Sequence, residues 1–222
     1  MYRNVRFAAV LALFLVFDHG SLLSQDHCLD LSKAERKTLA KKAMDGLNSS
    51  AVVAIRLQGF KKQIEKIDHL IEASSDPKVR EKLTKKRTIY LEEPKLWQKA
   101  LKSAFDEHYK LSEVVFYYDY DQDKVKSDDA KIWLNDDGQF ERRPDSKKVA
   151  FYLVQGTTPM KGLEAFMLRD SEFKEVCAPL PGYFKLNKLS SFFLYGEKER
   201  AKKAEKLAKS FQSDMQTLRA IL

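Results

Sequence analysis

The chain has 222 residues, of which 40 are lysine or arginine and 32 are aspartate or glutamate, and its formal net charge is +8. A chain of this length can form one well-cored domain with an appendage, or two small domains. Most of the basic residues are lysines, whereas proteins that read nucleic-acid bases rely on arginine for bidentate contacts, so the composition argues against nucleic-acid binding. The net charge instead predicts a weak attraction to anionic surfaces.

The first 24 residues have the features of a secretory signal peptide. Arg3 and Arg6 precede the apolar run at residues 7–17, and Ser24 offers a small residue at a cleavage point. This run is shorter than the roughly 20 residues that cross a bilayer, although an uncleaved N-terminal anchor is the alternative. No later segment is apolar enough to span a membrane. We therefore expect a secreted or extracytoplasmic protein of the periplasm or cell envelope, with no transmembrane segment after the signal peptide.

Cys28 and Cys177 are the two cysteines of the chain. In an oxidising compartment they could form one disulfide, which would close a long loop and stabilise the fold in the chain-entropy model. Two unpaired thiols are the alternative. Because neither cysteine belongs to a C-x-x-C motif, the sequence does not indicate thiol–disulfide exchange.

Residues 25–92 are predicted to form a helical region. Ser32 and Glu35 have the spacing of a capping box at the start of its first helix. A later stripe of apolar residues alternates spacings of four and three, as in a coiled coil or a helical hairpin. Its members are Val53, Leu57, Phe60, Ile64, Ile67 and Ile71. We call these six residues the seam, which could contact a partner or form intramolecular core, and we expect a helix starting at Pro77 to return antiparallel to it.

Residues 93–222 are predicted to form a sheet domain packed with helices. A helix from Pro94 leads into a strand at residues 113–120, and a hairpin follows with its turn at residues 135–138. The central feature is an antiparallel meander. Its three strands are expected at residues 149–154, 163–168 and 173–177.

A last helix is predicted from about Glu197 to the C-terminus. Its stripe begins with small residues, which permits close approach to another surface, and ends with large ones. The stripe comprises Ala201, Ala204, Ala208, Phe211, Met215, Leu218 and Leu222. The predicted fold class is therefore α+β, with an N-terminal helical hairpin followed by a mostly antiparallel sheet packed with helices.

No motif in the sequence indicates a catalytic, cofactor or metal site. Asp119, Asp121 and Asp123 have the alternating spacing that opens a calcium loop. However, Lys124 replaces the glycine of the sharp turn, and Ala130 replaces the bidentate glutamate. A solvated loop at the end of a strand is the better interpretation.

Two other groups of residues suggest a site only weakly. Residues 156–162 lack the phosphate-loop pattern and precede a strand, although the ends of such a loop could still line a binding edge. His69 and His108 have no second histidine or cysteine at ligand spacing. We therefore expect no cofactor and no metal.

The leading functional hypothesis is a non-enzymatic exported protein that acts in the envelope or outside the cell as an interaction or structural component, through a protein partner that the sequence does not identify. It rests on the two apolar stripes and on the missing catalytic motif. A basic, holdase-like exported chaperone is the first alternative. The second is a small-ligand-binding or hydrolytic domain that uses the sheet edge around residues 119–123 and 156–162.

Overall fold

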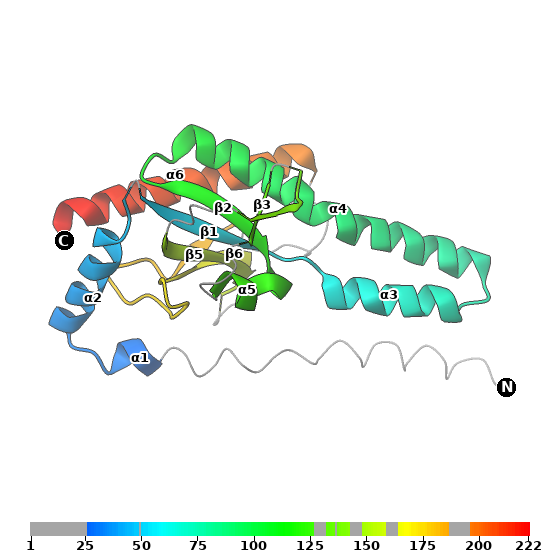
Figure 1. Cartoon of the computed structure of the whole chain (residues 1–222), viewed down its shortest axis with the longest axis horizontal. Coiled ribbons are helices and arrows are strands. Elements are labelled where there is room, and N and C mark those ends of the chain that lie inside the picture. Colours follow the sequence, from blue (N-terminus) through cyan, green and yellow to red (C-terminus); the bar gives the residue numbers. More distant parts are fainter. Residues whose placement is uncertain are drawn as a thin grey trace.

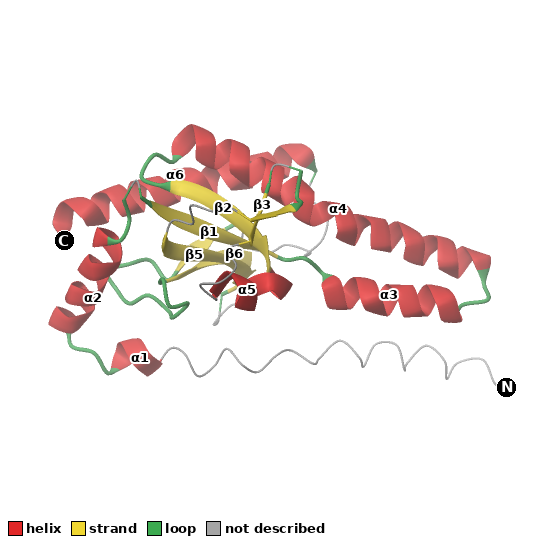
Figure 2. Cartoon of the chain, viewed as in Figure 1, coloured by secondary structure: helices red, strands yellow, loops and turns green. Residues whose placement is uncertain are grey.

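The structure is a computed structural model, shown in Figures 1 and 2. It describes residues 26–48, 50–126, 132–135, 137–142, 148–158, 164–186 and 196–222. The signal peptide expected at residues 1–24 lies outside these ranges. Among the residues described, no helix has both the length and the hydropathy to cross a membrane.

The helices and strands follow one another along the chain in a mixed order. The helices are α1 (Asp26–Leu29), α2 (Lys33–Asp45), α3 (Lys61–Ala73), α4 (Pro77–His108), α5 (Gln122–Lys126) and α6 (Glu197–Ile221), with a 3-10 turn at Asp119–Asp121. The strands are β1 (Ala51–Leu57), β2 (Glu113–Tyr118), β3 (Ile132–Leu134), β4 (Phe140–Arg142), β5 (Lys148–Thr157), β6 (Glu164–Arg169) and β7 (Tyr183–Lys185).

The main sheet has the strand order β2-β1-β5-β6-β7, and β3 pairs with β4 in a separate hairpin. β1 is parallel to β2 and to β5, whereas β6 and β7 continue the sheet antiparallel. The predicted α+β class is confirmed, and the predicted hairpin at β3 and β4 forms. The sheet itself is mixed, not mostly antiparallel, because two long connections bring β2 and β5 alongside β1 in the same direction.

β1 corrects the prediction that the seam lies on one continuous helix. Its sequence AVVAIRL is rich in β-branched residues, which favour a strand, and all of its residues except Arg56 are buried. Val53 and Leu57 point to one face of the sheet, whereas Val52 and Ala54 point to the other. A central strand covered on both faces carries no polar alternation, so its apolar residues also match a helical spacing.

Different layers cover the two faces of the sheet (Figure 1). The larger core lies between the sheet and the helices α2, α4 and α6, and includes Trp97, Phe105 and Phe211. The opposite face is covered by α5 and the β3–β4 hairpin, through Val125 and Trp133. The Ala-rich start of α6 packs against α4 and the sheet, since Ala204 and Ala208 are fully buried. The predicted last helix is thus confirmed, and part of its stripe is core.

α3 and the first half of α4 form an antiparallel pair that extends away from the sheet (Figure 1). We call residues 60–92 the helix pair, and the rest of the described chain the sheet body. The structure does not clearly show the N-terminal helical hairpin that we expected, because the residues preceding α3 form β1. The boundary that we placed between residues 92 and 93 falls inside α4.

Two further elements differ from the sequence predictions. Pro94 does not start a helix but lies inside the 32-residue helix α4, although proline has no N–H to donate within a helix. The third strand of the meander, expected at residues 173–177, is reduced to one bridge between Arg169 and Glu175. β7 takes the place beside β6 instead.

A disulfide joins Cys28 of α1 to Cys177, which lies between β6 and β7. The sequence left two alternatives open, one disulfide or two unpaired thiols, and the structure contains the disulfide. The bond connects residues 149 positions apart and attaches the N-terminal helices to the sheet body.

Candidate functional site

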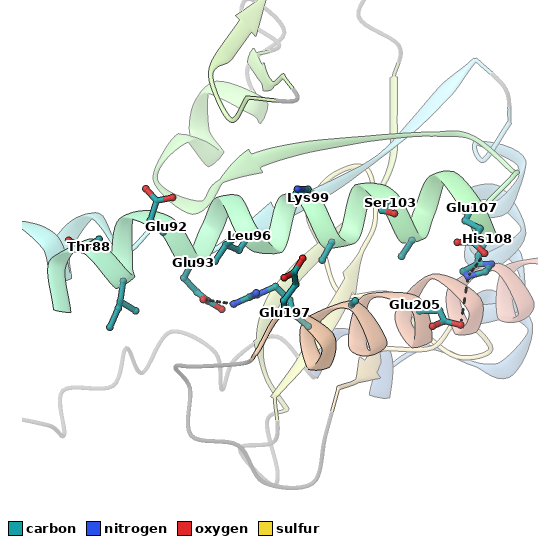
Figure 3. Close-up of a pocket in the computed structure, with 15 residues that line it drawn as sticks. Thr88, Glu92, Glu93, Leu96, Lys99, Ser103, Glu107, His108, Glu197 and Glu205 are labelled. Atoms are coloured by element: carbon teal, nitrogen blue, oxygen red, sulfur yellow. Dashed lines mark hydrogen bonds and ion pairs between the residues drawn. The ribbon is translucent and has the colours of Figure 1, made fainter. Parts of the chain in front are cut away.

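The most prominent hollow among the described residues is a groove between α4 and α6, with a volume of about 730 Å³ (Figure 3). The two helices run side by side in the same direction over one face of the sheet (Figure 1). Small residues keep them close: Ala104 of α4 and Ala204 of α6 are both buried. The groove follows the solvent-facing side of this contact, and we call it the α4–α6 groove.

Apolar side chains form the floor of the α4–α6 groove. Leu96 lies near the middle of the α4 side and is 43% exposed, which is high for a leucine on a helix that packs against a core. Ile89, Ala100 and Ala201 continue the apolar surface along the two helices. Because three of the lining residues are alanines, the floor is accessible to the side chains of a ligand.

The charge of the groove opposes the charge of the chain. Its lining contains five glutamates against one lysine and one arginine, a formal charge of −3, whereas the whole chain carries +8. The acidic residues are Glu92, Glu93, Glu107, Glu197 and Glu205. A cationic ligand is therefore attracted to this groove more than to the rest of the surface.

One ion pair of the groove is buried and fixes the two helices relative to each other. Arg200 Nη2 of α6 donates to Glu93 Oε2 of α4 at 2.8 Å, with both side chains largely buried (Figure 3). Breaking such a pair would leave a buried charge without compensation, so neither residue is available to a ligand. A second contact, 3.6 Å between Lys203 Nζ and Glu164 Oε2, joins α6 to β6.

The remaining carboxylates of the groove are exposed. His108 Nε2, at the end of α4, lies 3.5 Å from Glu107 Oε1 and 3.9 Å from Glu205 Oε1 of α6 (Figure 3). A hydrogen bond from Lys209 lowers the pKa of Glu205 below its ordinary value. Exposed pairs of this kind are weak and screened by solvent, so their carboxylates can exchange a lysine of this chain for a cation of a ligand.

The carboxyl ends of the parallel strands form a second candidate site, the sheet edge that the sequence singled out. Asp119 Oδ1 accepts hydrogen bonds from the backbone N–H of Gly59 at 2.9 Å and of Tyr120 at 3.0 Å. Asp121 is buried, and its Oδ1 accepts from Lys124 Nζ at 2.7 Å. Asp119 thus holds the end of β2 against the end of β1, whereas Asp121 contacts α5. Within the described ranges, no three histidine, cysteine, aspartate or glutamate residues are grouped to bind a metal ion.

Tight packing also shapes this edge. A Cβ added at Gly59 would come within 2.3 Å of the Tyr120 ring, so only glycine fits there. Burial is the main cause that raises the pKa of Tyr117 and Tyr120 and lowers that of Arg56. Arg56 Nη1 also donates to Gln122 Oε1, and its guanidinium lies 5.7 Å from the centre of the Phe173 ring. Residues 159–163 of the predicted edge lie outside the described residues.

The six seam residues divide between the two parts of the molecule. Val53 and Leu57 are fully buried in the larger core of the sheet body. The other four belong to the helix pair, in a small cluster around Tyr90, where Phe60 and Ile67 are buried and Ile64 and Ile71 are half-buried. The structure therefore does not assemble the seam into one surface.

Sequence analysis did not identify the α4–α6 groove. A partial signal existed, because Glu197, Ala201 and Glu205 recur every four residues on one side of α6, next to the stripe that we predicted to pack. The sequence does not indicate which helix lies beside α6. The answer depends on how the whole sheet assembles.

No family model matches the chain, and no curated protein or solved structure matches it either. Its function must therefore be argued from its own residues.

Proposed function

We propose that the chain is an exported, non-enzymatic protein that acts through contacts with another protein, and that the α4–α6 groove is its contact surface. The observation that carries the proposal is the groove itself, which combines an accessible apolar floor with an acidic rim. Protein-recognition surfaces commonly combine an apolar centre with a polar rim. Binding clefts between helices are common sites of peptide recognition.

Two features support export. Residues 1–24 have the charged and apolar segments of a signal peptide, and Cys28 and Cys177 form a disulfide, a bond that persists in oxidising compartments. The proposed location is therefore the envelope or the secreted fraction.

A photoreactive amino acid introduced at Leu96 tests the interaction. In cells that produce the full-length chain, we expect irradiation to give one discrete adduct with a protein of defined mass. The matched control is Leu39 on α2, which is 42% exposed but lies outside the α4–α6 groove. No adduct at Leu96, or the same adduct at both positions, would contradict the assignment of the groove as a contact surface.

A holdase-like chaperone is the second candidate, because the helix pair exposes apolar residues beside basic ones. Leu70 and Val79 are exposed, and lysines such as Lys78 and Lys82 lie on the same pair. The same photoreactive group at Leu70 separates the two candidates. Many adducts of different mass at Leu70, with none at Leu96, would indicate a chaperone that holds unfolded exported proteins.

A further inference from the structure

The shape and charge of the α4–α6 groove define what kind of protein segment fits it. Along α4, Glu92 and Glu107 mark the two ends of the acidic rim, and at 1.5 Å per residue they are about 22 Å apart along the helix axis. A helix of about 15 residues, or four turns, covers the same length. The apolar residues Leu96, Ala100 and Ala201 line the groove between these ends, and they match one apolar stripe of a helix.

The opposite charges of the groove and the chain restrict the partner further. A ligand that is attracted by the net charge of +8 is acidic, and it is repelled by the −3 of the groove lining. A basic segment is repelled by the net positive charge of the chain and attracted by the acidic lining of the groove. Glu107 is 71% exposed and Glu205 is 48% exposed, so both carboxylates are accessible to lysine or arginine side chains of a ligand.

We propose that the α4–α6 groove binds a basic amphipathic helix of a partner protein. The apolar stripe of that helix covers Leu96, Ala100 and Ala201, and its basic residues contact Glu92, Glu107 and Glu205. The buried pair of Glu93 and Arg200 holds the two walls in place without contributing a ligand contact. This inference rests on the proposed function and names the chemistry of the partner.

Two synthetic peptides and the full-length protein after signal-peptide removal test the proposal. The first peptide has about 15 residues, with leucines on one helical stripe and lysines elsewhere. The second has glutamate at every lysine position. Fluorescence anisotropy with labelled peptides is expected to show binding of the lysine peptide that weakens as salt is added, and weaker or no binding of the glutamate peptide.

Variants of the protein locate the binding. The double substitution Glu107→Gln and Glu205→Gln is expected to weaken binding of the lysine peptide about tenfold, because it removes two of the three carboxylates that the lysine side chains contact. The matched control is Glu81→Gln, which neutralises a carboxylate that is 65% exposed on the helix pair, outside the groove. It should leave the affinity unchanged. Leu96→Asp is expected to weaken binding at least as much as the double substitution, with an unchanged circular dichroism spectrum.

Several outcomes would overturn the proposal. They are tighter binding of the glutamate peptide, no binding of either peptide, or an equal affinity of the wild type and the double variant for the lysine peptide. If sedimentation shows that the chain dimerises and Leu96→Asp abolishes the dimer, the occupant is a second copy of the chain. A discrete adduct at Leu96 in cells, combined with no peptide binding, would retain the proposed function and reject only the basic helix.

Discussion

The sheet body and the helix pair bury their apolar residues to very different depths. In the body, Val53 and Leu57 are fully buried within a large core that includes α2, α4, α6 and the sheet. In the helix pair, the buried residues form a cluster of three, Phe60, Ile67 and Tyr90, while Leu70 is 47% exposed. The same alternation of apolar residues therefore corresponds to a core strand in one region and to a thin helix contact in the other.

This difference teaches that apolar spacing alone does not give the depth of burial. A layer that is covered on both sides buries every residue, whereas two helices side by side bury only the facing stripe. The stability of the molecule should accordingly reside in the sheet body, and the helix pair should open locally at a lower free-energy cost.

The largest expected effect comes from Leu57→Asp in the sheet body. Leu57 has no exposed surface, so the substitution would bury a carboxylate among apolar side chains, at a cost that exceeds the stability of many domains. We expect circular dichroism and size-exclusion chromatography to show an unfolded or aggregated protein.

The same substitution at Leu70, an exposed leucine of the helix pair, is the control. It should change the free energy of unfolding by less than about 0.5 kcal/mol. A folded Leu57→Asp variant would show that β1 is less essential to the core than its burial indicates.

An intermediate effect is expected when the disulfide of the body is removed. Cys28→Ser with Cys177→Ser opens a loop of 149 residues, which should lower the free energy of unfolding by about 5 kcal/mol in the chain-entropy model. Urea denaturation of the variant and the oxidised wild type measures the difference.

Reduction of the wild type should give the same decrease as the double substitution. If the decrease is below about 1 kcal/mol, the bond does not restrict the unfolded chain as the model assumes.

The smallest expected effect comes from Ile67→Ala in the helix pair. Ile67 is buried against Phe60 and Tyr90, whose rings stack at a centroid distance of 5.0 Å. Because Ile67 contacts few other buried side chains, its truncation should lower the free energy of unfolding by about 2 kcal/mol. This value is at the low end for a buried isoleucine. Hydrogen exchange should become faster in α3, while β1 and β5 keep their protection. Faster exchange throughout the sheet would show that the pair and the body unfold as one unit.

Much of the fold could be predicted from local signals. The capping box of Ser32 and Glu35 marks the start of α2, Asp76 caps α4, and both groups are present in the structure. The turn near Asn135 and Gly138 predicted the β3–β4 hairpin correctly. These features depend on a few neighbouring residues, which is why the sequence alone specifies them.

The errors have a common physical cause. The apolar spacing of β1 also fits a helix, because a doubly covered strand has no polar alternation. Pro94 is typical of a helix start, yet α4 continues through it. The groove was not predicted, because the spacing of Glu197, Ala201 and Glu205 describes only one of its walls. The two walls are about 100 residues apart in the chain and are joined by contacts such as that of Glu93 with Arg200, 107 positions apart. Long-range pairing of this kind leaves no local pattern.

The interior position of β1 in the sheet also determines the order in which the fold can assemble during synthesis. β1 is the first strand to leave the ribosome, at about 5–20 residues per second, yet its partners β2 and β5 begin at Glu113 and Lys148. The apolar segment Ala51–Leu57 therefore stays without its neighbours until most of the chain has been made, and Cys177 reaches Cys28 later still. We therefore expect the nascent chain to depend on chaperones during that interval more than the stability of the finished fold suggests.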